Sequence, residues 1–217
     1  MTDYTIIILG GTGQVGAAVV RALLNSSRCR EVIMITRRAA ASTFGERVRP
    51  VVMDTNSATF EQEVAKLVST TTKPVYGVSC VGIGSGSAKW SEEDILKLEV
   101  GVVSAFARGC KASGVSTFAL LSAAGASSDS WVRYLRHMGL KEDAIAAIGF
   151  TRLAIFRPGI IAGNSHTPGY VAALGRWLPG KGGTIEQDDI GKAFVRELER
   201  GDEVGTTILH NRDMRTG

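Results

Sequence analysis

The sequence predicts an α/β protein with a doubly wound, mostly parallel sheet and helices on both of its faces. Short apolar stretches of strand length alternate with amphipathic helical stretches, as in parallel sheets that are buried on both faces. The first apolar stretch, residues 6–9, runs into spaced glycines and then into an Ala- and Val-rich helical pattern over residues 17–24. Strand, glycine turn and helix in this order are typical of the Rossmann fold, so we expect the strand order 3-2-1-4-5-6.

Each later element has its own signal. Continuous apolar runs predict strands at residues 32–35, 51–53, 74–81, 118–121 and 153–156. Apolar residues at helical spacing predict helices at residues 57–69, 91–113 and 130–148. Ser57 and Ser91 can cap the first two of these helices, and Gly114 and Gly149 can end the last two.

The pattern loosens after Gly159. Residues 160–187 are rich in loop-forming residues, with a short helix expected at 171–178, and predict a small lid on the substrate side. A last helix is expected from Asp188 or Asp189 to about Arg200, followed by an edge strand at 206–209. No repeat or linker divides the chain, so we expect residues 1–217 to form a single domain.

Composition excludes several classes of function. The net charge of +4 comes from scattered basic residues, and aromatic residues make up only 6%, so no nucleic-acid surface is expected. No apolar stretch is long enough to cross a membrane. The three cysteines are far apart and form no C-x-x-C pair, so we expect no metal site and a reducing compartment. The first residues lack the basic region of a signal peptide, and we therefore expect a cytoplasmic protein.

The glycine-rich turn predicts a dinucleotide site. Gly10 or Gly11 would permit the sharp turn, Gly13 would let a pyrophosphate approach the backbone, and Gly16 would let the helix pack closely. The phosphates would lie at the helix N-terminus, against free N–H groups and the positive end of the helix dipole. The alternative is a turn that only joins a strand to a helix. The predicted cofactor-binding residues here are Gly10, Gly11, Thr12, Gly13, Gln14, Val15 and Gly16.

The end of the second strand indicates which nucleotide is preferred. Proteins that bind NAD carry an acidic residue there for the ribose 2′-hydroxyl, whereas this chain has Thr36, Arg37 and Arg38. A guanidinium group suits a phosphate because its planar fork donates parallel hydrogen bonds. We therefore expect NADP(H) in preference to NAD(H), with Arg37 as the first and Arg38 as the second ligand of the 2′-phosphate. The alternative is that both are solvated loop charges.

Other strand ends complete the predicted cofactor site. Asp54 closes the third strand and could accept a hydrogen bond from the adenine amino group, or could instead cap a helix or form an Asx-turn. Ser79, Cys80 and Val81 end the fourth strand and are small enough for a ribose to lie close. Pro158 turns the chain after the sixth strand, where its backbone is expected to line the cofactor pocket.

Four segments resemble the atypical short-chain dehydrogenase/reductases: residues 10–16, 36–38, 121–126 (LSAAGA) and 156–159 (FRPG). The subgroup of closest resemblance is the Tat-interacting-protein-like proteins, which are also similar to the NmrA-like NADP-binding group. The resemblance covers about residues 5–163. It implies a Rossmann fold that binds NADP(H) and, in enzymatic members, a Ser/Tyr/Lys site in which the tyrosine exchanges a proton with a carbonyl or an alcohol.

By this resemblance Ser122 and Tyr134 are the catalytic residues. Four positions after Tyr134, where the family has lysine, this chain has Met138, which can neither lower the pKa of the tyrosine nor bind a ribose. Lys141 lies about 10 Å further along the helix from Tyr134, so it would need an unusual path to replace the missing lysine. Alternatively, Tyr134 is an ordinary helix tyrosine.

Two classes of function therefore stay open. The first is an NADP(H)-dependent oxidoreductase that acts on a small carbonyl or alcohol. The second is a non-catalytic NADP(H)-binding redox sensor or protein-interaction module, with a protein partner or a second copy of the chain as its ligand. In a third possibility, positioning alone supports hydride transfer. The sequence does not identify the substrate.

Overall fold

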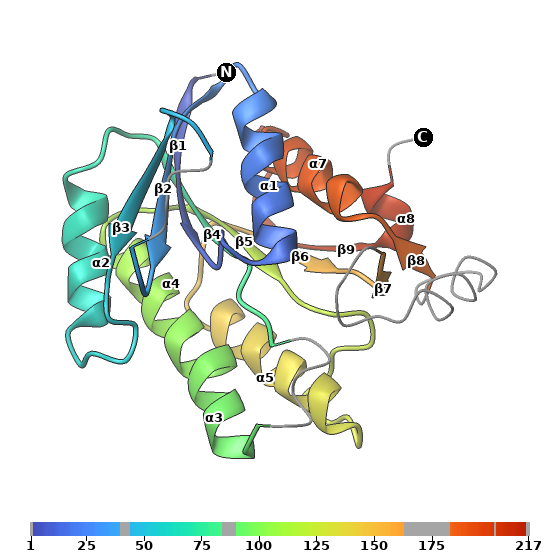
Figure 1. Ribbon diagram of the computed structural model, residues 1–217. Coiled ribbons are helices and arrows are strands. Elements are labelled where there is room, and N and C mark those ends of the chain that lie inside the picture. Colours follow the sequence, from blue (N-terminus) through green and yellow to red (C-terminus); the bar gives the residue numbers. More distant parts are fainter. Residues whose placement is uncertain (1, 40–43, 84–89, 163–182, 202, 216–217) are drawn as a thin grey trace.

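The computed structural model describes residues 2–39, 44–83, 90–162, 183–201 and 203–215. At its centre is a seven-stranded parallel sheet in the order β3-β2-β1-β4-β5-β6-β9 (Figure 1). This confirms the predicted order 3-2-1-4-5-6 and adds the expected edge strand beside β6. The strands are β1 (Tyr4–Leu9), β2 (Cys29–Thr36), β3 (Val48–Val52), β4 (Val75–Ser79), β5 (Thr117–Leu121), β6 (Arg152–Arg157) and β9 (Gly205–His210).

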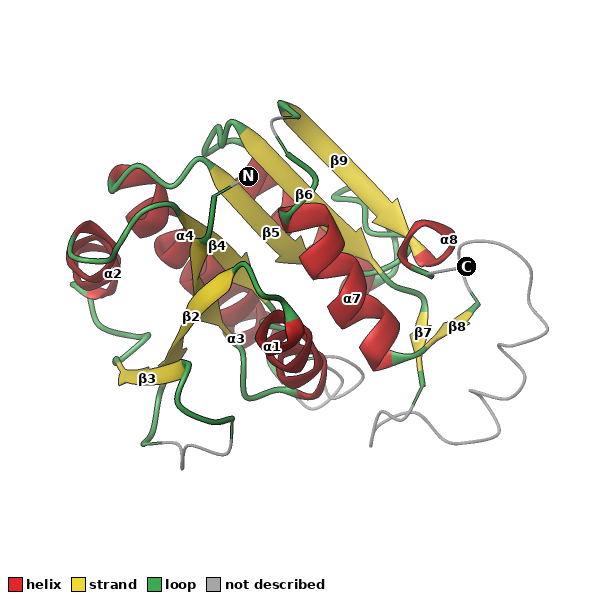
Figure 2. Cartoon of the chain, turned by 90° about the horizontal axis from the view of Figure 1, so that it is seen from above, coloured by secondary structure: helices red, strands yellow, loops and turns green. Residues whose placement is uncertain are grey.

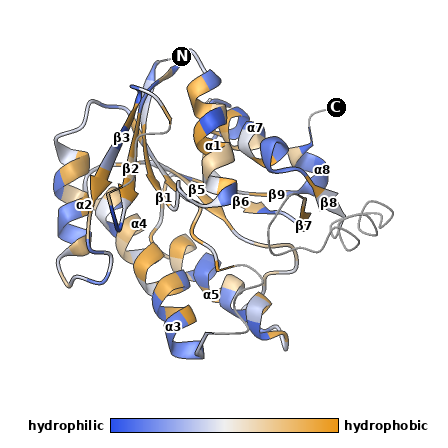
Figure 3. Ribbon diagram, in the orientation of Figure 1, coloured by the Kyte–Doolittle hydropathy of each residue, from blue (hydrophilic) through white to orange (hydrophobic). Residues whose placement is uncertain are grey.

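Helices cover both faces of the sheet (Figure 2). On one face α1 (Gln14–Asn25) packs beside α7 (Gln187–Leu198), and on the other lie α2 (Phe60–Ser69), α4 (Val103–Ala112) and α5 (Arg133–Ala146). Successive strand residues point to opposite faces, so Ile6 and Ile8 join the first core whereas Ile7 and Leu9 join the second. Polar and apolar stretches alternate along these helices, as expected for helices that are buried on one side (Figure 3).

Two predicted helices begin later than expected. Helix α2 starts at Phe60 instead of Ser57, and α5 starts at Arg133 instead of Ser130. In each case the serine hydroxyl accepts a backbone hydrogen bond two residues later, from Thr59 in one case and from Val132 in the other, and so forms a turn before the helix. Ser91, by contrast, caps its helix as predicted, accepting a hydrogen bond from the Asp94 N–H.

The helix predicted over residues 91–113 is interrupted. It consists of α3 (Glu92–Leu96), a π-helical segment η2 (Lys97–Val102) and α4. Apolar periodicity does not reveal this segment, because the buried positions Ile95, Val102 and Phe106 keep ordinary helical spacing through it. Short π-helical segments within helices are frequent at functional sites, and η2 contributes to the site described below.

The C-terminal region differs in detail from the prediction. Short strands β7 (Ile160–Ile161) and β8 (Thr184–Ile185) pair in parallel, and the last long helix begins at Gln187 and ends at Leu198. A short helix α8 (Asn211–Met214) was not predicted. Residues 163–182, which hold most of the predicted lid, lie outside the described residues. None of the helices in the described ranges combines the length and the apolarity that crossing a membrane would require.

Candidate functional site

The glycine turn after β1 has the predicted geometry, with the roles of two glycines now specified. Gly10 has a φ of +85°, and a Cβ there would lie 2.7 Å from the backbone carbon of Cys80, so this position needs glycine for both reasons. A Cβ on Gly16 would lie 2.1 Å from the Gly10 carbonyl oxygen. Gly16 therefore lets α1 begin directly against the turn.

The N-terminus of α1 faces open space. Gly13 is the N-cap in an extended conformation, and the first turn of the helix contains no acidic residue. A Cβ on Gly13 would meet only the Gly10 carbonyl oxygen, at 3.4 Å. Free N–H groups and the helix dipole at such a terminus favour an anion, so the turn fits a pyrophosphate.

Two cavities meet over this turn, at the carboxyl ends of the strands. The first, of about 350 Å³, is called the Tyr134 cavity here, and the second, of about 210 Å³, the Arg37 cavity. They share five lining residues and thus form one continuous groove. The shared residues are Thr12, Gly13, Cys80, Val81 and Gly82.

The Arg37 cavity contains the predicted 2′-phosphate ligand. Arg37 lines it, together with Thr36 and Thr55, and its described lining contains no acidic residue. Arg38 is exposed and does not line the cavity. The Asp54 carboxylate accepts a hydrogen bond of 2.9 Å from the Asn56 N–H, which is the Asx-turn kept as the alternative.

The residues predicted from the ends of β4 and β6 separate into two groups. Cys80 and Val81 line both cavities, and burial raises the pKa of the Cys80 thiol to about 12, so this thiol is uncharged. Ser79 is fully buried beneath them. Pro158 is also buried, and its carbonyl oxygen accepts a hydrogen bond from the Ala124 N–H at 2.8 Å. Ser79 and Pro158, like Gly11 and Gly16, support the groove without lining it.

The Tyr134 cavity brings together three residues of α5. Tyr134, Met138 and Lys141 all line it, as expected for positions that follow one face of a helix. The expectation that Lys141 would need an unusual path to this site is wrong. Side chains on a helix lean toward its N-terminus, so the long Lys141 side chain extends back toward the two preceding turns.

Lys141 is held by a buried ion pair. Its Nζ lies 2.9 Å from the Glu99 carboxylate and donates to the Val81 carbonyl oxygen at 3.3 Å. Both side chains are 1% exposed. The second carboxylate oxygen of Glu99 accepts the Ile83 N–H at 2.7 Å. The pair thus connects α5, η2 and the chain after β4.

The electrostatics around Tyr134 differ from those of a tyrosine activated as a base. Burial, and secondly the charge of Glu99, raise the pKa of Tyr134 to about 12. A nearby uncompensated cation would lower this pKa instead. Tyr134 is therefore protonated at neutral pH.

Ser122 belongs to a second buried network. Its hydroxyl donates to the Glu142 carboxylate, which also accepts hydrogen bonds from the guanidinium group of Arg157, one of them 2.9 Å from Nε. A serine hydroxyl carries a single proton. Ser122 therefore offers only acceptor capacity to the Tyr134 cavity.

Sequence reasoning missed Glu99 and Glu142, although a signal for each was present. Glu99 lies on the buried stripe formed by Ile95, Val102 and Phe106. Glu142 likewise lies between Met138 and Ile145 on the buried face of α5. A lone carboxylate on an otherwise apolar helix stripe must be paired or hydrogen-bonded when it is buried. Each of these two positions therefore predicts a buried polar partner.

These features define a nucleotide-binding Rossmann protein of the atypical short-chain dehydrogenase/reductase type. The chain belongs to the NAD(P)H-binding family, whose model matches residues 10–200. It is similar to the fungal protein fmp52, mitochondrial. Identity is 29% over 202 residues with the protein of Emericella nidulans, covering 88% of this chain and 85% of the relative, and 31% over 183 residues with that of Aspergillus clavatus, covering 83% and 76%.

Solved structures share the fold at low sequence identity. The oxidoreductase ylbE from Lactococcus lactis superposes with a TM-score of 0.68 at 16% identity, covering 95% of this chain and 90% of that one. The UDP-N-acetylglucosamine 4-epimerase from Bacillus cereus superposes with a TM-score of 0.66 at 15% identity, covering 96% and 78%. At these identities the likeness concerns the fold alone.

The relatives correct one expectation. The absence of a signal-peptide pattern led to the expectation of a cytoplasmic protein, whereas the relatives from Emericella, Aspergillus and Candida are all named mitochondrial. The expected cytoplasmic location is therefore wrong. A run of basic and then apolar residues marks a secretory segment, and its absence carries no information about other destinations.

Proposed function

We propose that the chain binds NADP(H) in preference to NAD(H) and reduces a small carbonyl compound. The observation that carries this proposal is the continuous groove from Arg37 through Gly13 to Tyr134. In the proposed arrangement Arg37 takes the 2′-phosphate, the N-terminus of α1 takes the pyrophosphate, and the nicotinamide lies in the Tyr134 cavity. Bound NADPH would supply the hydride.

The proton would come from Tyr134. Its pKa of about 12 keeps the hydroxyl protonated at neutral pH, so it can donate to a carbonyl oxygen but is a poor base for an alcohol. This direction of proton transfer favours reduction over oxidation. The substrate would be small, because the cavity of about 350 Å³ must also hold the nicotinamide ring.

Nucleotide titration of the purified protein tests the cofactor proposal. A ligand that binds only the folded state raises the melting temperature, so NADPH should raise it more than NADH at equal concentration. Arg37→Ala should lower NADPH affinity about tenfold or more and leave NADH affinity nearly unchanged. Arg38→Ala is the matched control, because Arg38 is exposed like Arg37 but does not line the cavity. Equal losses for both nucleotides in Arg37→Ala would refute the NADP preference.

A second candidate function is NADP(H) binding without turnover, as in a redox sensor or an interaction module. Three observations favour it: Met138 stands where the family has lysine, the Ser122 proton is held by Glu142, and the charge of Lys141 is paired. Met138→Lys separates the candidates. If it increases NADPH-dependent reduction of a panel of small aldehydes and ketones, the site is a weakened reductase; if wild type and variant are both silent while NADPH binds, the second candidate holds.

We also propose a mitochondrial location for this chain. Its support is the name shared by the relatives, several of which match over more than four fifths of this chain. A fluorescent fusion at the C-terminus should coincide with a mitochondrial marker. A diffuse cytosolic signal would contradict the proposal.

A further inference from the structure

We propose that Lys141 takes the place of the lysine missing at position 138 as the cation of the Tyr134 cavity, and that Glu99 is a positioning residue which holds this cation on Val81 and cancels its charge toward Tyr134. The inference rests on the proposed function only in treating Tyr134 as the proton donor. Met138 then does not mean that the site lacks a lysine. The site has Lys141 instead, and the positive charge of Lys141 is neutralised by Glu99.

Geometry places the ammonium group at the cavity. Tyr134, Met138 and Lys141 line it from one helix face, and the Lys141 Nζ lies 3.3 Å from the Val81 carbonyl oxygen. Val81 lines both parts of the groove. The ammonium group is thus at the junction where a dinucleotide would pass from one cavity into the other, although it starts two turns beyond Tyr134 on α5.

The carboxylate is fixed independently of the lysine. Glu99 lies on η2, is 1% exposed, and accepts the Ile83 N–H at 2.7 Å in addition to the ion pair. A buried carboxylate without partners would be strongly destabilised. The Ile83 N–H thus holds one carboxylate oxygen of Glu99 while the other oxygen pairs with Lys141.

Lys141 is the one charged side chain among the described residues that line the Tyr134 cavity. The other titratable groups in this lining are Tyr134 itself and the Cys80 thiol, whose pKa is raised to about 12 by burial. Glu142 and Arg157 lie behind Ser122 and neutralise each other. The charge of Glu99 raises the pKa of Tyr134, and in the proposed arrangement the positive charge of Lys141 acts in the opposite direction.

This arrangement determines what the tyrosine can do. An uncompensated ammonium group within about 4–6 Å lowers the pKa of an acid by roughly 1–3. With its charge cancelled by Glu99, Lys141 leaves Tyr134 protonated, as a donor should be. Removing the carboxylate should therefore convert the site toward one with an activated tyrosine.

The test uses 3-nitrotyrosine in place of Tyr134 in the full chain without nucleotide. The nitrophenol ionises near neutral pH and its anion absorbs visible light, so its pKa is measured separately from those of the other tyrosines. Glu99→Gln should lower this pKa by about 1 or more, whereas Glu99→Gln combined with Lys141→Met should restore part of the difference. The double variant is the matched control, because it removes the cation that is invoked.

Equal pKa values in Glu99→Gln and in the double variant would overturn the proposal, since the charge of Lys141 would then not reach Tyr134. If Glu99→Gln does not fold, as judged by circular dichroism, Lys141→Met alone decides: it should raise the pKa by about 1, and no change would overturn the proposal. A failure of NADPH to bind would refute the proposed function but would leave this titration intact.

Discussion

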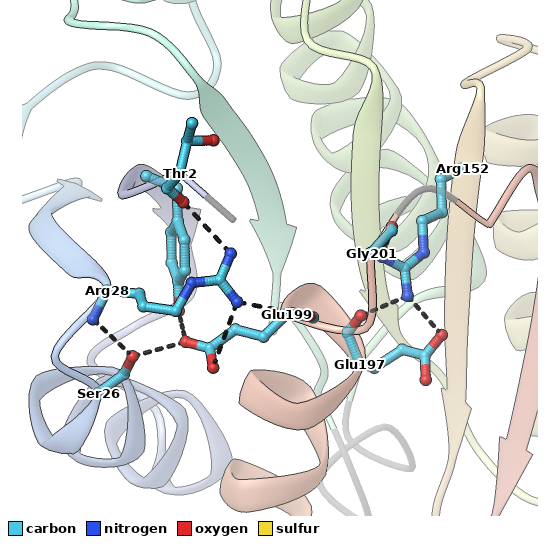
Figure 4. Close-up of polar contacts among 8 residues, drawn as sticks. Thr2, Ser26, Arg28, Arg152, Glu197, Glu199 and Gly201 are labelled. Atoms are coloured by element: carbon cyan, nitrogen blue, oxygen red, sulfur yellow. Dashed lines mark hydrogen bonds and ion pairs between the residues drawn. The ribbon is translucent and has the colours of Figure 1, made fainter.

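Buried ion pairs lie at both ends of the parallel strands: at the amino edge, where the strands begin, and at the carboxyl edge, where they end. The surroundings of the two pairs differ. At the amino edge Arg152, the first residue of β6, pairs with Glu197 of α7 at 2.9 Å and also donates to the backbone carbonyl of Gly201 at 3.0 Å (Figure 4). At the carboxyl edge Lys141 pairs with Glu99 at the same 2.9 Å. Lys141 lines the Tyr134 cavity, whereas Arg152 lines neither that cavity nor the Arg37 cavity.

A neighbouring polar network lies at the same amino edge, where Ser26, Arg28 and Glu199 line a separate cavity. Glu199 accepts hydrogen bonds from the hydroxyls of Tyr4 and Ser26, and the Arg28 guanidinium lies 3.8 Å from its carboxylate. Arg28 also donates to the Thr2 carbonyl (Figure 4). These groups connect the start of β1, the end of α1 and the end of α7, so their charges are used to join elements.

The two central ion pairs, Arg152–Glu197 and Lys141–Glu99, differ in their surroundings and not in their own geometry. Distance and burial do not separate them, since both central pairs are short and nearly inaccessible. Both cations also donate to a backbone carbonyl, and what separates them is that Lys141 lines the groove over the glycine turn whereas Arg152 does not. A lysine beside that groove can act on what enters it.

Arg152→Met should have the largest effect on stability. It leaves the Glu197 carboxylate buried with its main partner removed, which costs about 3–5 kcal/mol of unfolding free energy. NADPH affinity of the folded fraction should not change. Urea unfolding and nucleotide titration measure the two quantities separately.

Arg200→Met is the matched control for this prediction. Arg200 lies 3.5 Å from the same Glu197 carboxylate but its side chain is 52% exposed, so its loss should cost about 1 kcal/mol or less. Equal losses in the two variants, or a large loss of NADPH affinity in Arg152→Met, would break the distinction between the edges.

Ser122→Ala should have a smaller effect on stability. This variant also shows whether the role of Ser122 is structural or catalytic. The Glu142 carboxylate would lose one hydrogen bond but keep Arg157, so we expect a loss of about 1–2 kcal/mol in unfolding free energy. If Ser122 is structural, NADPH-dependent reduction by the folded fraction should persist. Unchanged stability with abolished reduction would instead make Ser122 a catalytic donor, contrary to the hydrogen bond seen here.

The fold could be predicted because its signals are local. Apolar runs mark the strands, Ser91 marks a cap, and the glycines at 10 and 16 mark a turn that no other residue could form without a clash. Helix starts were less predictable, because Ser57 and Ser130 satisfy turns as readily as caps. The π-helical segment left no periodic signal at all.

The candidate site was predictable only where it depends on the backbone. Gly13 and Arg37 follow strand ends directly, so their place at the carboxyl edge follows from topology. The partners of Lys141 and Ser122 do not, because Glu99 and Glu142 reach them from other elements across 42 and 20 positions of sequence. The sequence alone marks both carboxylates as unusual, because each lies on an apolar helix stripe. It does not show which residues they contact.

Tyr4→Phe should have the smallest effect and a characteristic pH dependence. The Tyr4 hydroxyl donates to Glu199 at 2.7 Å, while Ser26 and Arg28 still hold this carboxylate, so its loss should cost about 0.5–1 kcal/mol near neutral pH. Burial, and secondly the bond to Glu199, raise the pKa of Tyr4. Because the folded-state pKa lies above the unfolded value of about 10, this contribution is complete below that pH and is lost as pH rises. The difference in unfolding free energy between wild type and Tyr4→Phe should therefore shrink in alkaline solution.

Tyr76→Phe, which alters the ring stacked on Tyr4 at 5.2 Å, is the control that should keep the alkaline decline. An alkaline decline that persists in Tyr4→Phe would show that the amino-edge network does not hold this hydroxyl in its neutral form.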